Sequence, residues 1–261
     1  LIGEVSPWLI ASQTHEKSLQ NKFGIKIKHI LWNELKHYGD MEEKGILKES
    51  FPTADQRKLT ESEKVYELIL ETVNSNAADA VSVECFSMVK EHKVTACLAL
   101  AQLCKDGISA GCEGDIPSTV GLLLAKEITG SVPWMANLAS LHSEQGLFAH
   151  CTVSPDLIDS VKTPTHFETN EGLAVQGEFK GDAVTIFRFD ESFSKMFLCE
   201  TEIINRPKYK TACRTQIEVK LDKESVHKLR ENPLGNHHII VPGHIQNELE
   251  LFAHFKGIEV I

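Results

Sequence analysis

The chain has 261 residues, of which 42% are hydrophobic and 25% charged, so it can bury a full core without disulfide or metal cross-links. Its formal net charge is −10 and it has no cluster of Lys and Arg, which argues against a nucleic-acid-binding protein. No apolar stretch approaches the roughly 20 residues of a membrane span, and we expect no signal peptide because the first residues lack a basic start and a long apolar region.

Cysteine usage indicates a reducing compartment. The chain has seven cysteines, an odd number for a protein that needs no cross-links, and it has no CxxC pair of the kind found in structural zinc ribbons. We therefore expect a cytoplasmic protein. The sequence begins with Leu1 and not with Met, so we also expect it to be a fragment of a longer chain.

Strand and helix signals alternate through the first half of the chain. The expected elements are a strand at Ile25–Leu31, a helix that begins at the capping-box pattern Thr60–Glu63, a strand at Ala80–Phe86, a helix at Lys93–Lys105, a strand at Ile108–Glu113 and a helix from Pro117 to Thr129. Gly107 and Gly130 follow the last two helices, where glycine adopts the left-handed conformation that ends a helix. Strands separated by helices of about 10–15 residues predict a parallel α/β sheet.

The segments after Val132 are shorter and alternate between apolar and polar residues. The expected elements are strands at Gly172–Phe179, Ala183–Phe189, Met196–Ile204, Thr215–Leu221 and His238–Val241, a helix at Ile245–Phe255 and a strand at Ile258–Ile261. This pattern predicts a mostly antiparallel sheet or barrel that closes with a strand, a helix and a strand. We expect an α/β domain at residues 1–131 and a β-rich domain at residues 132–261, packed tightly because no low-complexity linker separates them.

Polar residues stand between an expected strand and helix at Cys112-Glu113-Gly114-Asp115. The carboxyl ends of strands in α/β sheets line the crevice where ligands bind, so Glu113 is a candidate ligand or base. The alternative is that Glu113 is solvated and Asp115 caps the helix that follows.

Asn137, His150 and the pair His237-His238 each lie at the end or the start of an apolar run. Single histidines in such runs are more often hydrogen-bonded core residues than ligands. Neighbouring strand residues point to opposite faces, so at most one of His237 and His238 can face a given site. Imidazole nitrogens combined with carboxylate or amide oxygens would suit Mn²⁺ or a similar divalent ion.

Taken in order, these motifs resemble the metal site of the L-fucose and L-arabinose isomerase superfamily. The motifs are Cys112–Asp115 with its apolar helix, Trp134–Asn137, Phe148–His150 and Gly235–His238. The opening segment Ile2–Ser12, which contains Ser6-Pro7-Trp8-Leu9, also resembles the entry to the second domain of that family. The resemblance covers the chain in outline, and these short motifs carry it.

The resemblance implies a role for each matching residue. Glu113 matches the catalytic, metal-binding glutamate, and His150 and His237 match metal-binding histidines. His238 is the alternative to His237, because short alignments can shift by one residue. The implied cofactor is Mn²⁺ or another divalent metal, and the implied reaction isomerises a small-molecule aldose to a ketose through an enediol. In that reaction Glu113 carries the proton between C1 and C2.

Asn137 departs from the family pattern. At Asn137, or at Ala136, the family has a carboxylate that binds metal and carries a proton. Asn can supply an oxygen ligand but cannot act as a base, so we expect Asn137 in the metal site and the mechanism changed. Asp115 is the nearest carboxylate that could replace the proton carrier, and a helix cap is its alternative role.

Family members also begin with a further α/β domain that is absent here, and their oligomers complete each active site with that domain from a neighbour. The resemblance therefore implies a homo-oligomer, a trimer or hexamer, when the chain is complete, and a fragment without activity on its own.

Two other functions remain open. The same metal site could support epimerisation or lyase-type cleavage of a sugar derivative, or the change at Asn137 could leave a metal-dependent sugar-binding protein without turnover. Turnover by the complete chain separates the enzymes from the binding protein, and the identity of the product separates the enzymes from one another. The sequence does not determine the sugar, since specificity comes from loops.

Overall fold

The structure, a computed structural model, describes the backbone of residues 1–261 and every side chain except that of Ile10. Its helices are α1 (Glu16–Phe23), α2 (Ile46–Ser50), α3 (Gln56–Ser75), α4 (Phe86–His92), α5 (Cys97–Lys105), α6 (Ile116–Thr129), α7 (Lys223–Glu231) and α8 (Gln246–Lys256). Its strands are β1 (Ala80–Val83), β2 (Ser109–Cys112), β3 (Trp134–Leu141), β4 (Gln145–His150), β5 (Ile158–Lys162), β6 (Gln176–Phe179), β7 (Ala183–Phe189), β8 (Lys195–Asn205), β9 (Thr215–Lys220), β10 (His237–Pro242) and β11 (Glu259–Val260).

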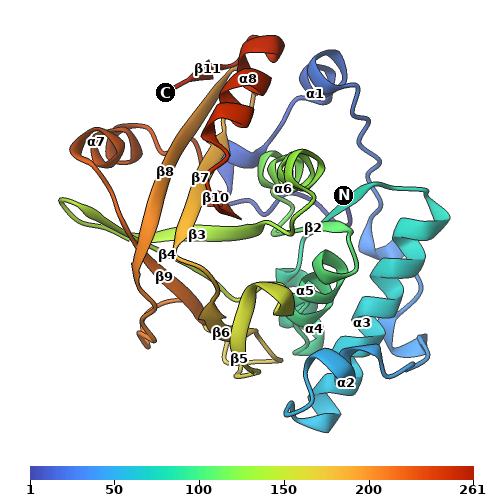
Figure 1. The fold of residues 1–261 in the computed structure, drawn as a ribbon. Helices are drawn as coiled ribbons and strands as arrows, with labels where there is room; N and C mark the ends of the chain where they lie inside the picture. The colour runs from blue at the N-terminus through green and yellow to red at the C-terminus, as the bar shows by residue number, and fades with distance from the viewer.

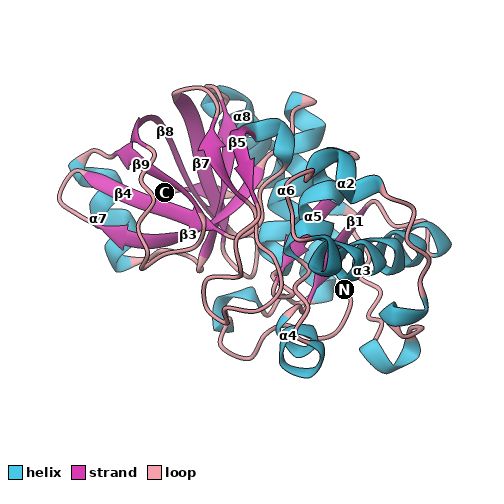
Figure 2. Ribbon diagram, turned by 90° about the horizontal axis from the view of Figure 1, so that it is seen from below, coloured by secondary structure: helices cyan, strands magenta, loops and turns pink.

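The second half of the chain forms a closed barrel. Its strands pair in the order β8, β7, β10, β3, β4, β9, and a further pairing joins β9 back to β8. All of these pairs are antiparallel, while β11 adds to β8 as a parallel strand. Closure leaves the barrel strands without a free edge. Figure 2 shows the barrel on one side of the molecule and most of the helices on the other.

A small parallel sheet forms the first half. β1 pairs with β2, and Ile2 forms parallel bridges to both Val83 and Ile30 at the other edge of β1. α5 and α6 both pack on β2, and α3 packs on α5 (Figure 1). The carboxyl ends of β1 and β2 therefore lie at the same edge of the small sheet, and α4 and α6 begin at that edge.

Helix α6 joins the sheet to the barrel. It contacts β1 and β2 on one side and β7 and β10 on the other. A Cβ atom at Gly121 would lie only 2.7 Å from Cγ1 of Ile239, so glycine allows α6 to approach the barrel closely. One apolar core continues from Val83 through Leu122 to Ile240. Because the core is continuous, the division into domains at residue 131 stays a prediction.

The structure confirms the predicted fold class, an α/β chain with a small parallel sheet and a larger, mostly antiparallel sheet. The predicted strand at Ala183–Phe189 has the observed bounds of β7. α6 begins after the Asp115 cap and ends at Gly130, which adopts φ 66°. The predicted closing strand, helix and strand correspond to β10, α8 and β11.

Two expectations in the first half are wrong. Ile25–Leu31 is not a strand, because Leu1–Gly3 takes the position beside β1 and leaves only Ile30 to form a bridge. α3 begins a turn before Thr60, with Asp55 as its cap. Glu63 caps a different helix, since its carboxylate accepts hydrogen bonds from the first N–H groups of α2 at 2.7 and 2.8 Å.

Other elements are shorter than expected. α5 begins at Cys97 and not at Lys93, because Lys93 adopts φ 61° and ends α4. β1 ends at Val83, and the chain turns into α4 at Phe86. β6 begins only at Gln176, after a turn in which Gly172 has φ 51°. No helix was predicted at α1, α2, α4 or α7.

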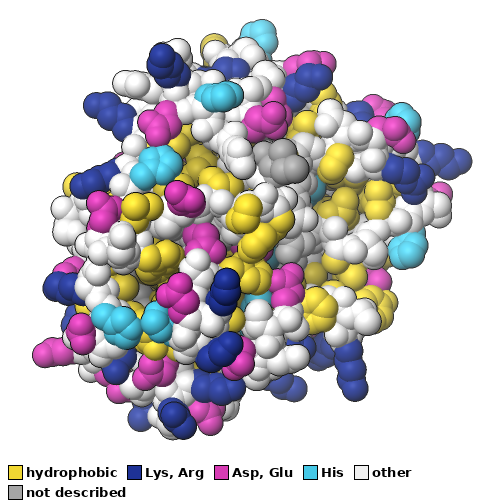
Figure 3. Space-filling view, turned by 180° about the vertical axis from the view of Figure 1, so that it is seen from behind, with side chains coloured by type: hydrophobic (Ala, Val, Ile, Leu, Met, Phe, Trp, Pro, Cys, Tyr) yellow, Lys and Arg dark blue, Asp and Glu magenta, His cyan; other side chains and the backbone are white. Residues whose placement is uncertain are grey.

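The surface carries charges of both signs, and the cysteines are not paired in disulfides. No helix among the described residues combines the length and the apolar character of a membrane span. On the face drawn in Figure 3, Lys and Arg side chains are interspersed with Asp and Glu and do not form a basic patch. All seven cysteines are free thiols.

Candidate metal centre

Three buried residues from distant parts of the chain meet between the small sheet and the barrel. Glu113 follows β2, His150 ends β4 and His237 begins β10. One ligand atom of each lies within 4.8 Å of the other two. The exposed fractions of the three residues are 8%, 4% and 0%. The cluster could therefore hold a metal ion away from bulk water.

The backbone at Glu113 is left-handed. Glu113 has φ 59° and Gly114 has φ 72°, and a non-glycine residue in this region is uncommon and often found at functional sites. The turn places the Glu113 carboxylate between two partners. Its Oε2 accepts a hydrogen bond from the indole N–H of Trp8 at 2.9 Å, and its Oε1 lies 3.6 Å from Nε2 of His237.

These partners keep Glu113 ionised. Burial by itself raises the pKa of a carboxyl group, but the nearby His237 ring, followed by the hydrogen bond from Trp8, outweighs it. The pKa of Glu113 is lowered to about 2. The carboxylate is therefore ionised and available as a metal ligand.

His237 is held by Asp115. Its Nδ1 donates to Oδ2 of Asp115 at 2.9 Å, and its Nε2 is buried without a hydrogen-bond partner. Burial disfavours the charged ring, but the carboxylates of Asp115 and Glu113 outweigh it and raise the pKa of His237 to about 9. A carboxylate on one ring nitrogen is the usual arrangement around metal-binding histidines, and Nε2 of His237 becomes a ligand atom when a metal ion displaces its proton.

His150 has a different environment. Burial, followed by the charge of His237, lowers its pKa to about 4, so the ring is neutral. Its Nδ1 accepts a hydrogen bond from the N–H of Thr152 at 3.1 Å and lies 3.4 Å from the carbonyl oxygen of the same residue. Nε2 has a free lone pair only in the tautomer whose Nδ1–H donates to the Thr152 carbonyl, and in that tautomer it is available as a metal ligand.

Asp115 is fully buried and fully engaged. It caps α6 through the N–H of Ser118 at 3.0 Å, and both of its oxygens accept from Arg188, at 2.9 and 3.0 Å. Burial raises its pKa, but the charge of Arg188 and the hydrogen bond from His237 outweigh it and hold the pKa well below its usual range. These contacts favour the helix-cap alternative, with Asp115 also positioning His237, and a catalytic role stays a prediction.

The neighbouring histidine points the other way. Ile239 packs on α6 at Gly121, so strand alternation sends His238 into the barrel, where its ring lies 5.6 Å from that of Phe148 and 5.9 Å from that of Phe197. Burial, followed by the charge of Arg188, lowers the pKa of His238 to about 3. The geometry brings His237, and not His238, to the cluster with Glu113.

Asn137 lies directly opposite His237 in the pairing of β3 with β10. Its side-chain oxygen accepts a hydrogen bond from Nδ2 of Asn236 at 2.7 Å. It is therefore beside the cluster, and its role as a metal ligand stays a prediction.

The sequence did not identify two residues of the site. Arg188 is 1% exposed, and its guanidinium also donates to Ser118 and to the carbonyl of Ala11. The available signal was an arginine inside the apolar strand β7, because a buried charge requires a partner. Trp8 was part of a quoted motif, but nothing in the sequence places its indole on Glu113.

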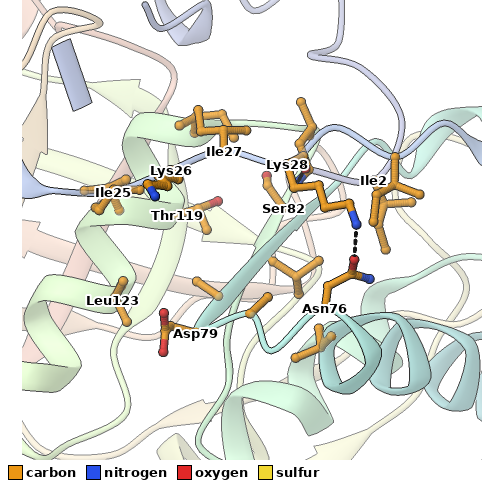
Figure 4. A pocket seen from close by; sticks show the side chains of 18 of the residues that line it. Ile2, Ile25, Lys26, Ile27, Lys28, Asn76, Asp79, Ser82, Thr119 and Leu123 are labelled. Atoms are coloured by element: carbon orange, nitrogen blue, oxygen red, sulfur yellow. Dashed lines mark hydrogen bonds between the residues drawn. The ribbon is translucent and has the colours of Figure 1, made fainter. Parts of the chain in front are cut away.

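A cavity of about 670 Å³ lies elsewhere, between β1, α6 and the segment 24–28 (Figure 4). Ser82, Thr119 and Leu123 line it, and Lys28 closes one side by donating to Asn76 at 2.5 Å. None of the three clustered residues lines this cavity. The candidate site therefore follows from the chemistry of Glu113, His150 and His237 and not from the size of a pocket.

Curated proteins that are similar to the chain are sugar isomerases. No protein-family model matches the chain. The chain is similar to the sulfoquinovose isomerases of Priestia aryabhattai and of Priestia megaterium (strain ATCC 12872 / QMB1551). Each is 22% identical over 216 residues, an alignment that covers 72% of this chain and 46% of the relative. The chain thus spans about half the length of these curated relatives, and its similarity is to sugar isomerases.

Proposed function

We propose that the chain carries the metal site of an aldose–ketose isomerase, with Glu113, His150 and His237 as ligands of Mn²⁺ or a similar divalent ion. The observation that carries this proposal is the buried cluster of one carboxylate and two imidazoles within 4.8 Å. The similarity to sulfoquinovose isomerases supports a sugar as the substrate class. The complete protein is proposed to be a cytoplasmic homo-oligomer, a trimer or hexamer.

The residues fit a divalent ion. Nε2 of His237 is a buried polar atom without a partner, a costly state that a metal bond would relieve. One carboxylate and two imidazoles form a mixed oxygen and nitrogen set that suits Mn²⁺ and similar ions. Asp115 is not one of the ligands but orients His237, because its carboxylate accepts a hydrogen bond from Nδ1 of that ring.

In this proposal Glu113 transfers the proton that moves from C2 to C1 of the sugar. A bound divalent ion would polarise the carbonyl and adjacent hydroxyl of the sugar and so acidify the proton on the α-carbon. The ionised carboxylate of Glu113 accepts the proton from C2 of the aldose and returns it to C1 of the same sugar. The hydroxyl proton must also move from O2 to O1, and this second transfer needs its own carrier. Asn137 cannot supply it, so we propose that Asp115 or water does.

Metal content tests the ligand set. We expect Glu113→Ala and His237→Gln to lose bound manganese, measured by elemental analysis after dialysis. His238→Leu is the matched control, because His238 is equally buried but faces the barrel. Manganese retained by both ligand variants would refute the assignment, and its loss only in the His238 variant would shift the ligand by one residue.

Product analysis tests the reaction. The complete chain, loaded with manganese, would be incubated with L-fucose, L-arabinose and sulfoquinovose in D₂O. Because the protonated Glu113 can exchange with D₂O before it returns a proton, we expect part of the ketose product to carry solvent deuterium at C1, and no product from Glu113→Gln. An epimer or a cleaved sugar would establish one of the alternatives, and binding without any product would indicate a sugar-binding protein.

A further inference from the structure

Trp8 combines two features that are seldom found together. Its indole N–H donates to the buried Oε2 of Glu113 at 2.9 Å, yet 54% of the residue is exposed. With 54% of the residue exposed, protein atoms do not enclose the indole ring. The ring of Phe86 meets it edge to face at 4.9 Å and an interplanar angle of 88°. Trp8 thus stands at the rim of the candidate metal centre with an open aromatic surface.

The segment around Trp8 is fixed to the site. The N–H of Ser6 donates to the carbonyl of Glu113 at 3.0 Å, and the N–H of Leu9 donates back to Ser6 at 2.9 Å. At the far end of the segment, Arg188 donates to the hydroxyl of Ser12 at 3.3 Å. The same arginine holds Asp115, so the segment is tied at both ends to residues of the site.

We infer that Trp8 is the substrate platform of this site: its N–H positions Glu113 and its open face stacks on the apolar C–H face of a sugar. The negatively polarised ring face attracts the positively polarised C–H groups, while sugar hydroxyls stay free for polar partners. This inference rests on the proposed function. It adds a residue that acts on both the proton carrier and the substrate.

Two substitutions separate these roles. Trp8→Phe keeps an aromatic ring but removes the N–H, so kcat for the aldose that the complete chain converts falls about tenfold with little change in KM. Trp8→Leu removes both, so KM also rises by about threefold to tenfold. Phe255→Leu is the control, since Phe255 is a 77% exposed aromatic on α8, which packs on β8 and β11.

Fluorescence tests the platform without requiring turnover. The chain has three tryptophans, and Trp8 is the most exposed. Adding L-fucose, L-arabinose or sulfoquinovose to the manganese-loaded protein should change tryptophan emission in the wild type and not in Trp8→Phe. A response from Trp8 in a protein that forms no ketose supports the platform and refutes the isomerase. Turnover with no Trp8 response and unchanged KM in Trp8→Leu overturns the platform alone, and absence of both turnover and response overturns both.

Discussion

Asp115 gives all of its hydrogen-bonding capacity to protein groups. It accepts from the N–H of Ser118, from Arg188 and from Nδ1 of His237, and it is 0% exposed. A proton carrier must reach the substrate with a free lone pair, whereas the lone pairs of Asp115 are occupied by protein donors. At the scale of single residues, these contacts favour Asp115 as the residue that positions His237, and its role as a proton carrier stays a prediction.

Replacing Asp115 tests this role. Asp115→Asn keeps a helix cap but leaves Arg188 buried without a counter-charge, so we expect the free energy of unfolding in urea to fall by about 3 kcal/mol. Loss of the carboxylate behind His237 should weaken manganese binding by about 10–100-fold, measured by calorimetry. Asp222→Asn is the control, because Asp222 caps α7 through Ser225 at 2.7 Å at an exposed site. Unchanged metal affinity with turnover reduced by about 10²–10⁴-fold would instead make Asp115 the proton carrier.

A carboxylate at position 137 tests whether a second proton carrier limits the reaction. Asn137→Asp keeps the acceptor for Asn236 and adds a base opposite His237. We expect turnover of the complete chain to rise at least about tenfold, within the usual contribution of a positioned acid or base. Steady-state kinetics with metal content measured in parallel provides the check. Abolished turnover at full metal occupancy would mean that the site has adapted to a neutral group.

At the scale of elements, the sequence predicts helix caps and helix ends, which depend on neighbouring residues. It does not predict contacts between residues that are far apart in the chain. The Asp115 cap and the Gly130 stop of α6 lie next to the helix they bound, so the sequence predicted α6 correctly. The expected strand at Ile25–Leu31 failed because Leu1–Gly3 takes its place beside β1. The ion pair of Arg188 with Asp115 spans 73 residues of sequence, so no local pattern reveals it.

Gly114 couples the opening segment to the site. Its φ is 72°, and a Cβ there would lie 2.6 Å from the carbonyl oxygen of Glu4. Gly114→Ala should therefore destabilise the protein by about 3 kcal/mol in urea unfolding, from backbone strain plus the clash. Gly130→Ala has a similar φ of 66° with no atom within 4 Å, so it should cost about 1 kcal/mol from strain alone. Equal losses would show that the segment does not pack on Gly114 in solution.

At the scale of the whole molecule, the candidate metal centre bridges the two halves. Glu113 follows β2 of the small sheet, whereas His150 and His237 belong to the barrel. α6 is the packed connection between them, and its cap Asp115 holds His237. The sequence motifs named the three residues, but only closure of the barrel and the position of α6 bring them within 4.8 Å.

A bridging ion should therefore stabilise the entire fold. An ion that binds only the folded chain at 100 times its Kd adds about 2.7 kcal/mol, which raises Tm by roughly 5–10 °C for a chain of this size. We expect this rise on adding MnCl₂ to metal-free protein in a thermal melt, and none in His237→Gln. His238→Leu should start from a different Tm but keep the manganese-dependent rise, because His238 faces the barrel interior. An equal rise in Tm in His237→Gln and in the wild-type protein would place the stabilising ion outside this cluster.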